Sequence, residues 1–396
     1  MKKTLVLSII LLSAIVARAQ SVWTVCNSPV TEKLQSVFMP EANKVLIGGK
    51  SGTLLMSTDY GTTFTTIPLG ITDDINAIYF FNSQNGIMLL GDHFMKTTNG
   101  GSNWTHISEV PGKAKGFSFI SQDTGYVACD FGLAFSTTNG GTSWNALTTG
   151  VTERLETAFF KNYSEGFFGG RNETSLRTTD HGSSFTTNVI PANGDVKDIQ
   201  FINSTNGYTC GDNGEVLFTS DGGSSWNALS TPRNNVDMDA LHFTDQLNGW
   251  CSGEAGTMFH TMNGGTNWVL DVSNTTREIN NVHLFDDLHG FAVCDSGTII
   301  RFGNGSVSVG SIATNNSVNL NVFPNPAENS FIISGSNIGT DSKLSILDVT
   351  GKLVFSCQMS SPAINLNAET ISLTPGIYMC KLESAKSSST VRLIIK

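Results

Sequence analysis

The chain repeats a short hairpin pattern at a nearly constant spacing, and this repeat is the strongest constraint on its fold. The clearest copy is Thr219-Ser220-Asp221-Gly222-Gly223-Ser224-Ser225-Trp226. Related copies end at Phe64, Trp104, Trp144, Phe185 and Trp268, so successive aromatic residues are separated by 40, 40, 41, 41 and 42 residues. A period near 40 residues is typical of a β-propeller, in which each repeat supplies one blade of four short strands.

A second pattern accompanies each hairpin. A hydrophobic residue that closes a predicted first strand stands six positions before a glycine, or its equivalent, that opens the second strand. The pairs are Phe38 and Lys44, Phe80 and Gly86, Phe119 and Gly125, Phe160 and Gly166, Phe201 and Gly207, Phe243 and Gly249, and Leu284 and Gly290. The sequence therefore contains seven units, and each sheet needs neighbouring sheets on both faces to bury its apolar residues.

The seventh unit, residues 279–301, lacks an aromatic residue for an outer strand. Trp23 lies 41 residues before Phe64, in register with the other hairpin aromatics. We therefore expect residues 21–26 to supply the outer strand of the last unit, which closes the ring without a free strand edge. The predicted fold is all-β, a seven-bladed β-propeller closed by its N-terminal strand.

The hairpins follow the pattern Ser/Thr-x-Asp/Asn-x-Gly-x-x-Trp/Phe and resemble Asp-boxes, also called bacterial neuraminidase repeats. With their regular spacing and Gly-aromatic second strands, residues 22–304 resemble the propeller family of photosystem II assembly and stability factors. The resemblance implies that the Asp-box is a structural hairpin. Its acidic position reads Asp59, Asn99, Asn139, Asp180, Asp221 and Asn263. Amides in half of the copies fit a turn-capping role and exclude proton transfer there.

Both ends of the chain carry address signals. Residues 1–19 combine Lys2 and Lys3, a short apolar run and Ala17-Arg18-Ala19, the pattern of a secretory signal peptide. The predicted propeller occupies residues 20–304, and a small-residue linker occupies 305–319. No other long apolar segment follows, so no membrane span is expected.

Residues 320–396 form a turn-punctuated series of short strands, which predicts a small immunoglobulin-like β-sandwich. Four stretches occur in order, beginning at Asn321-Val322-Phe323-Pro324-Asn325-Pro326-Ala327, Leu347-Asp348-Val349-Thr350-Gly351, Leu373-Thr374-Pro375-Gly376-Ile377-Tyr378 and Val391-Arg392-Leu393. They resemble the type A C-terminal sorting domain of the type IX secretion system of Bacteroidota. The resemblance implies secretion across the outer membrane to the cell surface or medium, with the secretion machinery and a sortase as partners of residues 320–396.

Charge and cysteine content exclude other classes. The formal net charge of −10 argues against nucleic acid as a partner, because phosphate recognition needs a basic surface. The seven cysteines are widely spaced and form no CxxC pair, so they are expected to be small buried hydrophobes. A disulfide between Cys357 and Cys380 remains open.

Two sets of charged residues mark a candidate ligand-binding rim. Asp130, Asp212, Glu254 and Asp295, with Arg171 in a related place, begin the turns from second to third strand. They either cap tight turns or bind a ligand or cation. Counting back four from each strand-closing residue gives a second column, Leu34, Asn76, Lys115, Glu156, Lys197, Asp239 and Asn280. Its four central charges alternate in sign at the expected channel mouth, as inter-blade ion pairs or as a polar pocket.

No catalytic constellation accompanies these residues. The seven histidines form no HxH, HExxH or Cys/His pattern, so neither a metal nor a cofactor is expected. The sequence favours a non-catalytic binding or scaffold module for an extracellular protein or glycan. The alternative is a glycan-processing hydrolase of sialidase-like or xyloglucanase-like propeller type that uses rim carboxylates, since carboxylate separation decides that chemistry.

Overall fold

The computed structural model divides the chain into two compact units, residues 1–306 and 307–396, which are described separately. It describes residues 22–303 of the first unit and residues 320–323, 327, 330–335, 342–348, 352–359, 361, 363–384 and 387–395 of the second. The predicted signal peptide and linker lie outside the described residues. Within the described ranges, no helix has the length and apolar character needed to cross a membrane.

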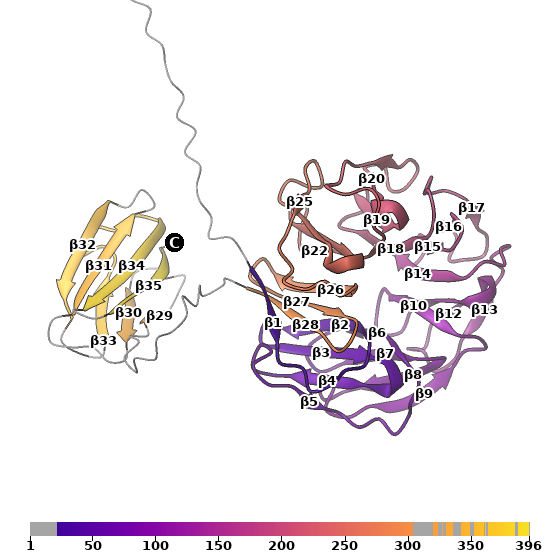
Figure 1. Ribbon diagram of the computed structural model, residues 1–396, viewed down its shortest axis with the longest axis horizontal. Coiled ribbons are helices and arrows are strands. Elements are labelled where there is room, and N and C mark those ends of the chain that lie inside the picture. The colour runs from indigo at the N-terminus through magenta and orange to yellow at the C-terminus, as the bar shows by residue number, and fades with distance from the viewer. Residues whose placement is uncertain are drawn as a thin grey trace, which may run out of the picture. The chain divides into compact units, whose positions relative to one another are not determined.

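The first unit is a ring of seven four-stranded antiparallel sheets (Figure 1). Blades 1 to 3 are β2(Leu34–Glu41)–β3(Lys44–Gly49)–β4(Leu54–Ser57)–β5(Thr65–Thr66), β6(Ile75–Phe80)–β7(Gly86–Leu90)–β8(His93–Thr97)–β9(Thr105–Glu109) and β10(Ala114–Phe119)–β11(Gly125–Cys129)–β12(Ala134–Thr137)–β13(Asn145–Leu147). Blades 4 to 6 are β14(Leu155–Phe160)–β15(Gly166–Gly170)–β16(Ser175–Thr178)–β17(Thr186–Thr187), β18(Val196–Phe201)–β19(Gly207–Gly211)–β20(Val216–Thr219)–β21(Asn227–Ala228) and β22(Met238–Phe243)–β23(Gly249–Gly253)–β24(Met258–Thr261)–β25(Val269–Leu270). Blade 7 is β26(Ile279–Asp286)–β27(His289–Cys294)–β28(Ile299–Gly303), completed by β1(Val22–Cys26).

The second strand of each blade is buried on both faces, because the neighbouring blades cover it from either side. This burial explains why the strand-closing hydrophobic residue is followed, six positions later, by a glycine that opens the second strand. Phe201 pairs with Gly207 across the first and second strands of blade 5. A Cβ at Gly207 would lie 2.7 Å from carbons of the Phe201 ring, so the ring needs a residue without a side chain beneath it.

The ring closes without a covalent link, as the sequence predicted. β1 pairs antiparallel with β28, from Val22 opposite Gly303 to Cys26 opposite Ile299. Trp23 is 0% exposed, and its ring centroid lies 5.0 Å from that of Phe302. The first strand of the propeller therefore covers the edge that its last strand would otherwise expose.

Blade 1 is shifted by one residue relative to the prediction. Val45 of β3 pairs with Ser57, as Gly86 of blade 2 pairs with Thr97, so Val45 rather than Lys44 is the equivalent of the glycine. Buried Met39 stands six positions before Val45 and replaces Phe38 as the strand-closing residue. Phe38 instead lies on the channel wall, and its ring centroid is 4.5 Å from that of His283.

The Asp-box hairpins are held by their own side chains. In blade 5 the Thr219 hydroxyl donates to Oδ1 of Asp221 at 2.8 Å and accepts the Gly223 amide at 2.8 Å. Oδ1 of Asp221 also accepts the Ser225 amide at 2.9 Å. In blade 3, Oδ1 of Asn139 accepts the same kind of amide bond at 2.9 Å. One carbonyl-type oxygen is enough to accept this amide, which is why both asparagine and aspartate occur at this position.

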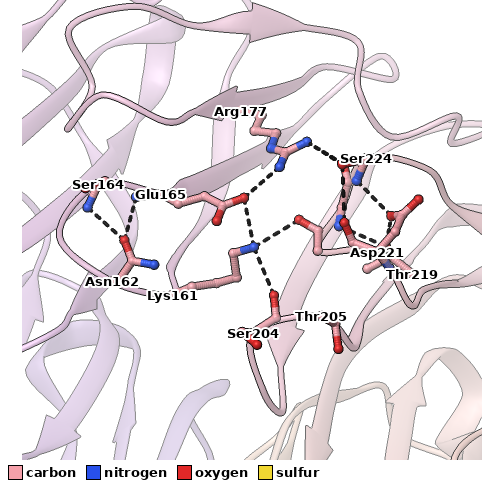
Figure 2. Close-up of polar contacts among 12 residues, drawn as sticks. Lys161, Asn162, Ser164, Glu165, Arg177, Ser204, Thr205, Thr219, Asp221 and Ser224 are labelled. Carbon is pink, nitrogen blue, oxygen red and sulfur yellow. Dashed lines mark hydrogen bonds and ion pairs between the residues drawn. The ribbon is translucent and has the colours of Figure 1, made fainter.

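Blades 4 and 5 are also joined by a half-buried ion network (Figure 2). Nζ of Lys161, whose side chain is only 6% exposed, lies 2.8 Å from Glu165 and donates to the carbonyl oxygens of Gly222 and Ser204. Arg177 donates to Glu165 at 2.7 Å and to the Ser224 hydroxyl at 3.1 Å. Burial opposes ionisation of Glu165, but the two cations outweigh it and lower the pKa of the carboxyl.

The second unit is a two-sheet sandwich. One sheet has the order β29(Leu320–Phe323)–β30(Ser330–Gly335)–β33(Ala363–Asn367), and the other has the order β32(Leu353–Gln358)–β31(Lys343–Asp348)–β34(Gly376–Ser384)–β35(Ser387–Ile395). Residues of both sheets, including Phe331 and Leu344, share one hydrophobic core. All seven cysteines of the chain are free, and β31 separates the strands of Cys357 and Cys380. The open possibility of a disulfide between them is therefore excluded.

Candidate functional site

A β-bulge occurs at the same place in the innermost strand of every blade. In each case the pairing of first and second strands skips one residue, for example between Ile75 and Ala77 or between Val196 and Asp198. The skipped residues are Gln35, Asn76, Lys115, Glu156, Lys197, Asp239 and Asn280. Because a bulge re-aims a side chain, seven repeats of it direct seven polar side chains to one place. In blade 1 this residue is Gln35 and not the predicted Leu34, which is fully buried.

These seven residues line one pocket of about 310 Å³ at the channel mouth. The remaining lining residues are all charged: Lys33, Arg154, Arg171 and Glu278. Lys33, Arg154 and Glu278 stand two positions before the bulge of their blades. That position is charged in every blade, reading Lys33, Asp74, Lys113, Arg154, Asp195, Asp237 and Glu278. Sequence reasoning missed this column two positions before the bulge, although all seven of its residues are charged.

Lys197 is the ion-pair centre on one side of the pocket. Its Nζ lies 3.2 Å from Asp239 of the next blade and 3.5 Å from Asp212. Burial alone would lower the pKa of Lys197, but the carboxylates outweigh burial and raise it. Burial raises the pKa of Asp239 to about 6, against the lowering effect of Lys197. One cation shared by two acids compensates each of them only in part, and Oδ2 of Asp239 has no partner among the described residues.

Glu156 is bound within its own blade. Oε1 of Glu156 lies 3.3 Å from Arg154 and 3.0 Å from Arg171. Arg154 in turn lies 2.6 Å from Asp130. The alternating charges predicted ion pairs between neighbouring blades, and of these the pair between Lys197 and Asp239 is present. Within residues 22–303, neither Lys115 nor Lys197 pairs with Glu156.

Lys115 is consequently the unpaired cation of the pocket. Its ammonium group has no ion-pair or hydrogen-bond partner among the residues that the structure describes. Its side chain is half-buried and belongs to the bulge of blade 3. A half-buried ammonium group without a carboxylate is available to an anionic group from outside.

The recurring acidic residues at the turns lie outside the pocket and bind the residues around its mouth. Asp130, Asp212 and Glu254 each begin a single 3-10 turn, η2(Asp130–Gly132), η3(Asp212–Gly214) and η4(Glu254–Gly256). Asp212 and Glu254 accept backbone amides of Asp195 and Asp237, which lead into the innermost strands. Asp295 accepts from Asn280 at 2.9 Å and lies 3.1 Å from Lys33. Among the predicted rim residues, Lys115, Glu156, Arg171, Lys197 and Asp239 line the pocket, while the four turn acids do not.

Below the mouth, the channel wall forms a second cavity of about 450 Å³. Its polar side chains are used between blades. Oδ2 of Asp198 accepts the Leu241 amide, and Nε2 of His242 binds the carbonyl of Leu284 at 2.9 Å. Burial raises the pKa of Asp198 to about 6 and lowers that of His242 to about 4.

Comparison with family models gives two matches. Residues 15–158 and 184–269 match the model described as photosynthesis system II assembly factor YCF48. Residues 321–396 match the secretion system C-terminal sorting domain. That domain directs delivery by the type IX secretion system to the cell surface or extracellular space. A search of curated proteins found no match.

Solved structures share the propeller fold. YCF48 bound to D1 peptide has a TM-score of 0.61 at 19% identity, and the match covers 71% of this chain and 94% of that one. YCF48 from Cyanidioschyzon merolae has a TM-score of 0.60 at 17% identity, with coverages of 72% and 100%. PorZ, a surface component of the type-IX secretion system of Porphyromonas gingivalis, has a TM-score of 0.53 at 12% identity, with coverages of 91% and 59%. Identities this low establish the fold alone.

Proposed function

Because the chain belongs to the photosynthesis system II assembly factor YCF48 family and ends in a secretion sorting domain, we propose that its propeller is a non-catalytic binding module. The proposed ligand site is the pocket at the channel mouth, and the proposed ligand is an acidic segment of an extracellular protein. Residues 320–396 would engage the secretion machinery and a sortase before the module acts outside the outer membrane.

One observation carries this proposal. All seven blades direct a bulged polar side chain into the pocket, yet Lys115 has no charge partner among the described residues. If the charged residues of the pocket served only to hold the blades together, each of them would have an ion-pair partner, as Lys197 and Asp239 have. The unpaired ammonium group, with Arg171 half exposed on the adjacent blade, favours a carboxylate from a partner.

A protein ligand is favoured over a glycan by the family. A YCF48 structure was determined with a D1 peptide bound, so a propeller of this fold can hold a peptide. A site that combines cations with the amide groups of Gln35 and Asn76 offers donors to both a carboxylate and a peptide backbone.

The hydrolase alternative has less support. Asp198 and Asp239 are the carboxyls whose pKa is raised to about 6, as a general acid requires. Asp198 is half-buried, however, and accepts the amides of Ile199 and Leu241. Asp239 forms an ion pair with Lys197. Both carboxyls therefore have structural roles that account for their positions.

Peptide arrays test the binding proposal. The purified full chain should bind acidic peptides saturably and neutral or basic peptides weakly, with affinity falling as salt increases. Lys115→Gln should weaken acidic peptide binding about tenfold or more, since a hydrogen bond to a charged group is lost. Lys113→Gln is the matched control, because Lys113 is exposed, lies in the same blade and does not line the pocket.

Two results would count against the proposal. Equal affinity of the Lys115→Gln and wild-type proteins for every peptide would remove the pocket as the site. Release of sugar products from a panel of polysaccharides, lost in Asp239→Asn, would replace the binding module with the hydrolase.

A further inference from the structure

The outer edge of blade 2 differs from those of blades 1 and 3 to 6. Its second and third strands are joined by the two-residue turn Gly91-Asp92, so β8 begins at His93. The outer strand β9 pairs with β8 as far as Glu109 opposite His93, whereas the outer strands β5, β13, β17, β21 and β25 contain two or three residues. The longer hairpin extends the sheet with side chains that the fold does not require.

A bulge in β9 brings three ligand-type side chains to one face. Residues three apart on a regular strand point to opposite faces, which would separate His106 from Glu109. Here the pairing shifts between Phe94 and Met95, so that His106 lies opposite Met95 while Glu109 lies opposite His93. Since His93 and Met95 share a face, His106 and Glu109 share it as well.

The donor atoms lie at distances that suit one metal ion. Nδ1 of His93 lies 3.2 Å from Nε2 of His106 and 3.6 Å from Oε2 of Glu109. One donor atom from each of the three residues lies within 4.8 Å of the others. Tetrahedral coordination with bonds of about 2.0–2.1 Å places neighbouring donors about 3.3 Å apart. Small side-chain rotations would therefore bring the three donor atoms to the separations that such a site requires.

We propose that His93, His106 and Glu109 form a binding site for a divalent transition-metal ion, with Zn²⁺ as the expected occupant. Two imidazoles and one carboxylate are the ligand set that Zn²⁺ accepts with a fourth position left for water. Ca²⁺ and Mg²⁺ prefer sites made of oxygen alone and are not expected to compete.

Asp92 supports this arrangement from behind. Its Oδ1 lies 3.4 Å from Nε2 of His93, the ring nitrogen that faces away from His106 and Glu109. A carboxylate that accepts the distal N–H orients a ligating imidazole and increases its basicity. The His93 side chain is 28% exposed and that of Glu109 is 67% exposed, so an ion reaches the site from solvent.

Without metal, the same contact between His93 and His106 is a hydrogen bond from one ring to the other. The two interpretations differ in what the full chain does with Zn²⁺. Isothermal titration of the metal-free protein with ZnCl₂ should give saturable binding of one ion to wild type. The same titration with CaCl₂ should give no heat of binding, and Co²⁺ should produce the visible absorption of four-coordinate cobalt.

Variants locate the ion. His93→Gln and His106→Gln should each abolish the saturable Zn²⁺ binding, and Asp92→Asn should weaken it about tenfold. His181→Asn is the control, since His181 is exposed and far from this hairpin in sequence, and asparagine tolerates its positive φ of 65°. Circular dichroism spectra identical to wild type show that each variant is folded. Unchanged Zn²⁺ affinity in both histidine variants, or no binding by wild type, would overturn the proposal.

Discussion

Substitution Trp23→Ala tests the non-covalent closure of the ring. The Trp23 indole is completely buried in a core that also contains Trp250 and Met258 of blade 6 and Phe302 of blade 7. Its backbone carbonyl accepts a hydrogen bond from Asn274 at 2.6 Å. Through this burial and this hydrogen bond, Trp23 joins the first strand of the propeller to both blade 6 and blade 7.

The expected cost follows from that burial. Truncating a fully buried tryptophan to alanine typically removes about 3–5 kcal/mol of unfolding free energy. At roughly 2 °C per kcal/mol for a domain of this size, the propeller should melt about 6–10 °C lower. Trp104 occupies the corresponding hairpin position of blade 2 and is only half-buried, so Trp104→Ala should lower the melting temperature by roughly half as much.

Thermal unfolding of the full chain, followed by near-ultraviolet circular dichroism, measures both effects. Light scattering at the same temperatures should rise earlier for Trp23→Ala, because loosening of β1 exposes the edge of β28 to other molecules. A melting temperature lowered equally by the two substitutions, with no earlier scattering, would refute the view that β1 seals the ring.

Three further predictions concern charges and domains. Glu165→Gln leaves Lys161 and Arg177 without their carboxylate and should lower the free energy of unfolding by about 2–3 kcal/mol, as urea titration would measure; an unchanged midpoint would contradict the network. Burial lowers the pKa of His242 to about 4, so wild type should lose stability as pH falls from about 6.5 towards 4. His242→Gln should reduce this loss between pH 7 and pH 5, and an equal loss in both proteins would contradict the assignment. A chain lacking residues 320–396 should keep a folded propeller but fail to reach the surface, which cell fractionation checks.

The repeat made most of the fold predictable. Residues that pack between blades, such as Phe201 over Gly207, recur because each blade meets the same neighbours, so the pattern appears directly in the sequence. The prediction slipped in blade 1, where Met39 and Val45 fill the positions of the aromatic residue and glycine. The aromatic Phe38 beside Met39 then shifted the count by one and gave Leu34 in place of Gln35.

The candidate sites were less predictable because bulges determine them. A bulge changes which face a residue occupies, yet no particular residue type marks it. The residues at the innermost bulges could be found because seven copies align, and Lys115, Glu156, Lys197 and Asp239 were identified by counting back from the strand-closing residues. The bulge in β9 occurs once, so the sequence alone gave no reason to place His106 beside His93.

The pairing of β1 with β28 also fixes the order in which the propeller matures. Val22 and Gly303 are partners in one ladder, but nearly the whole propeller separates them along the chain. During synthesis and translocation, β1 emerges first, and it is the only strand of blade 7 available until the other six blades have emerged. Such long-range pairing slows folding, because the entropy cost of closing the long loop precedes the favourable free energy of the contact. Completion of the ring thus waits for the last propeller strand, and the sorting domain emerges only after that strand has become available.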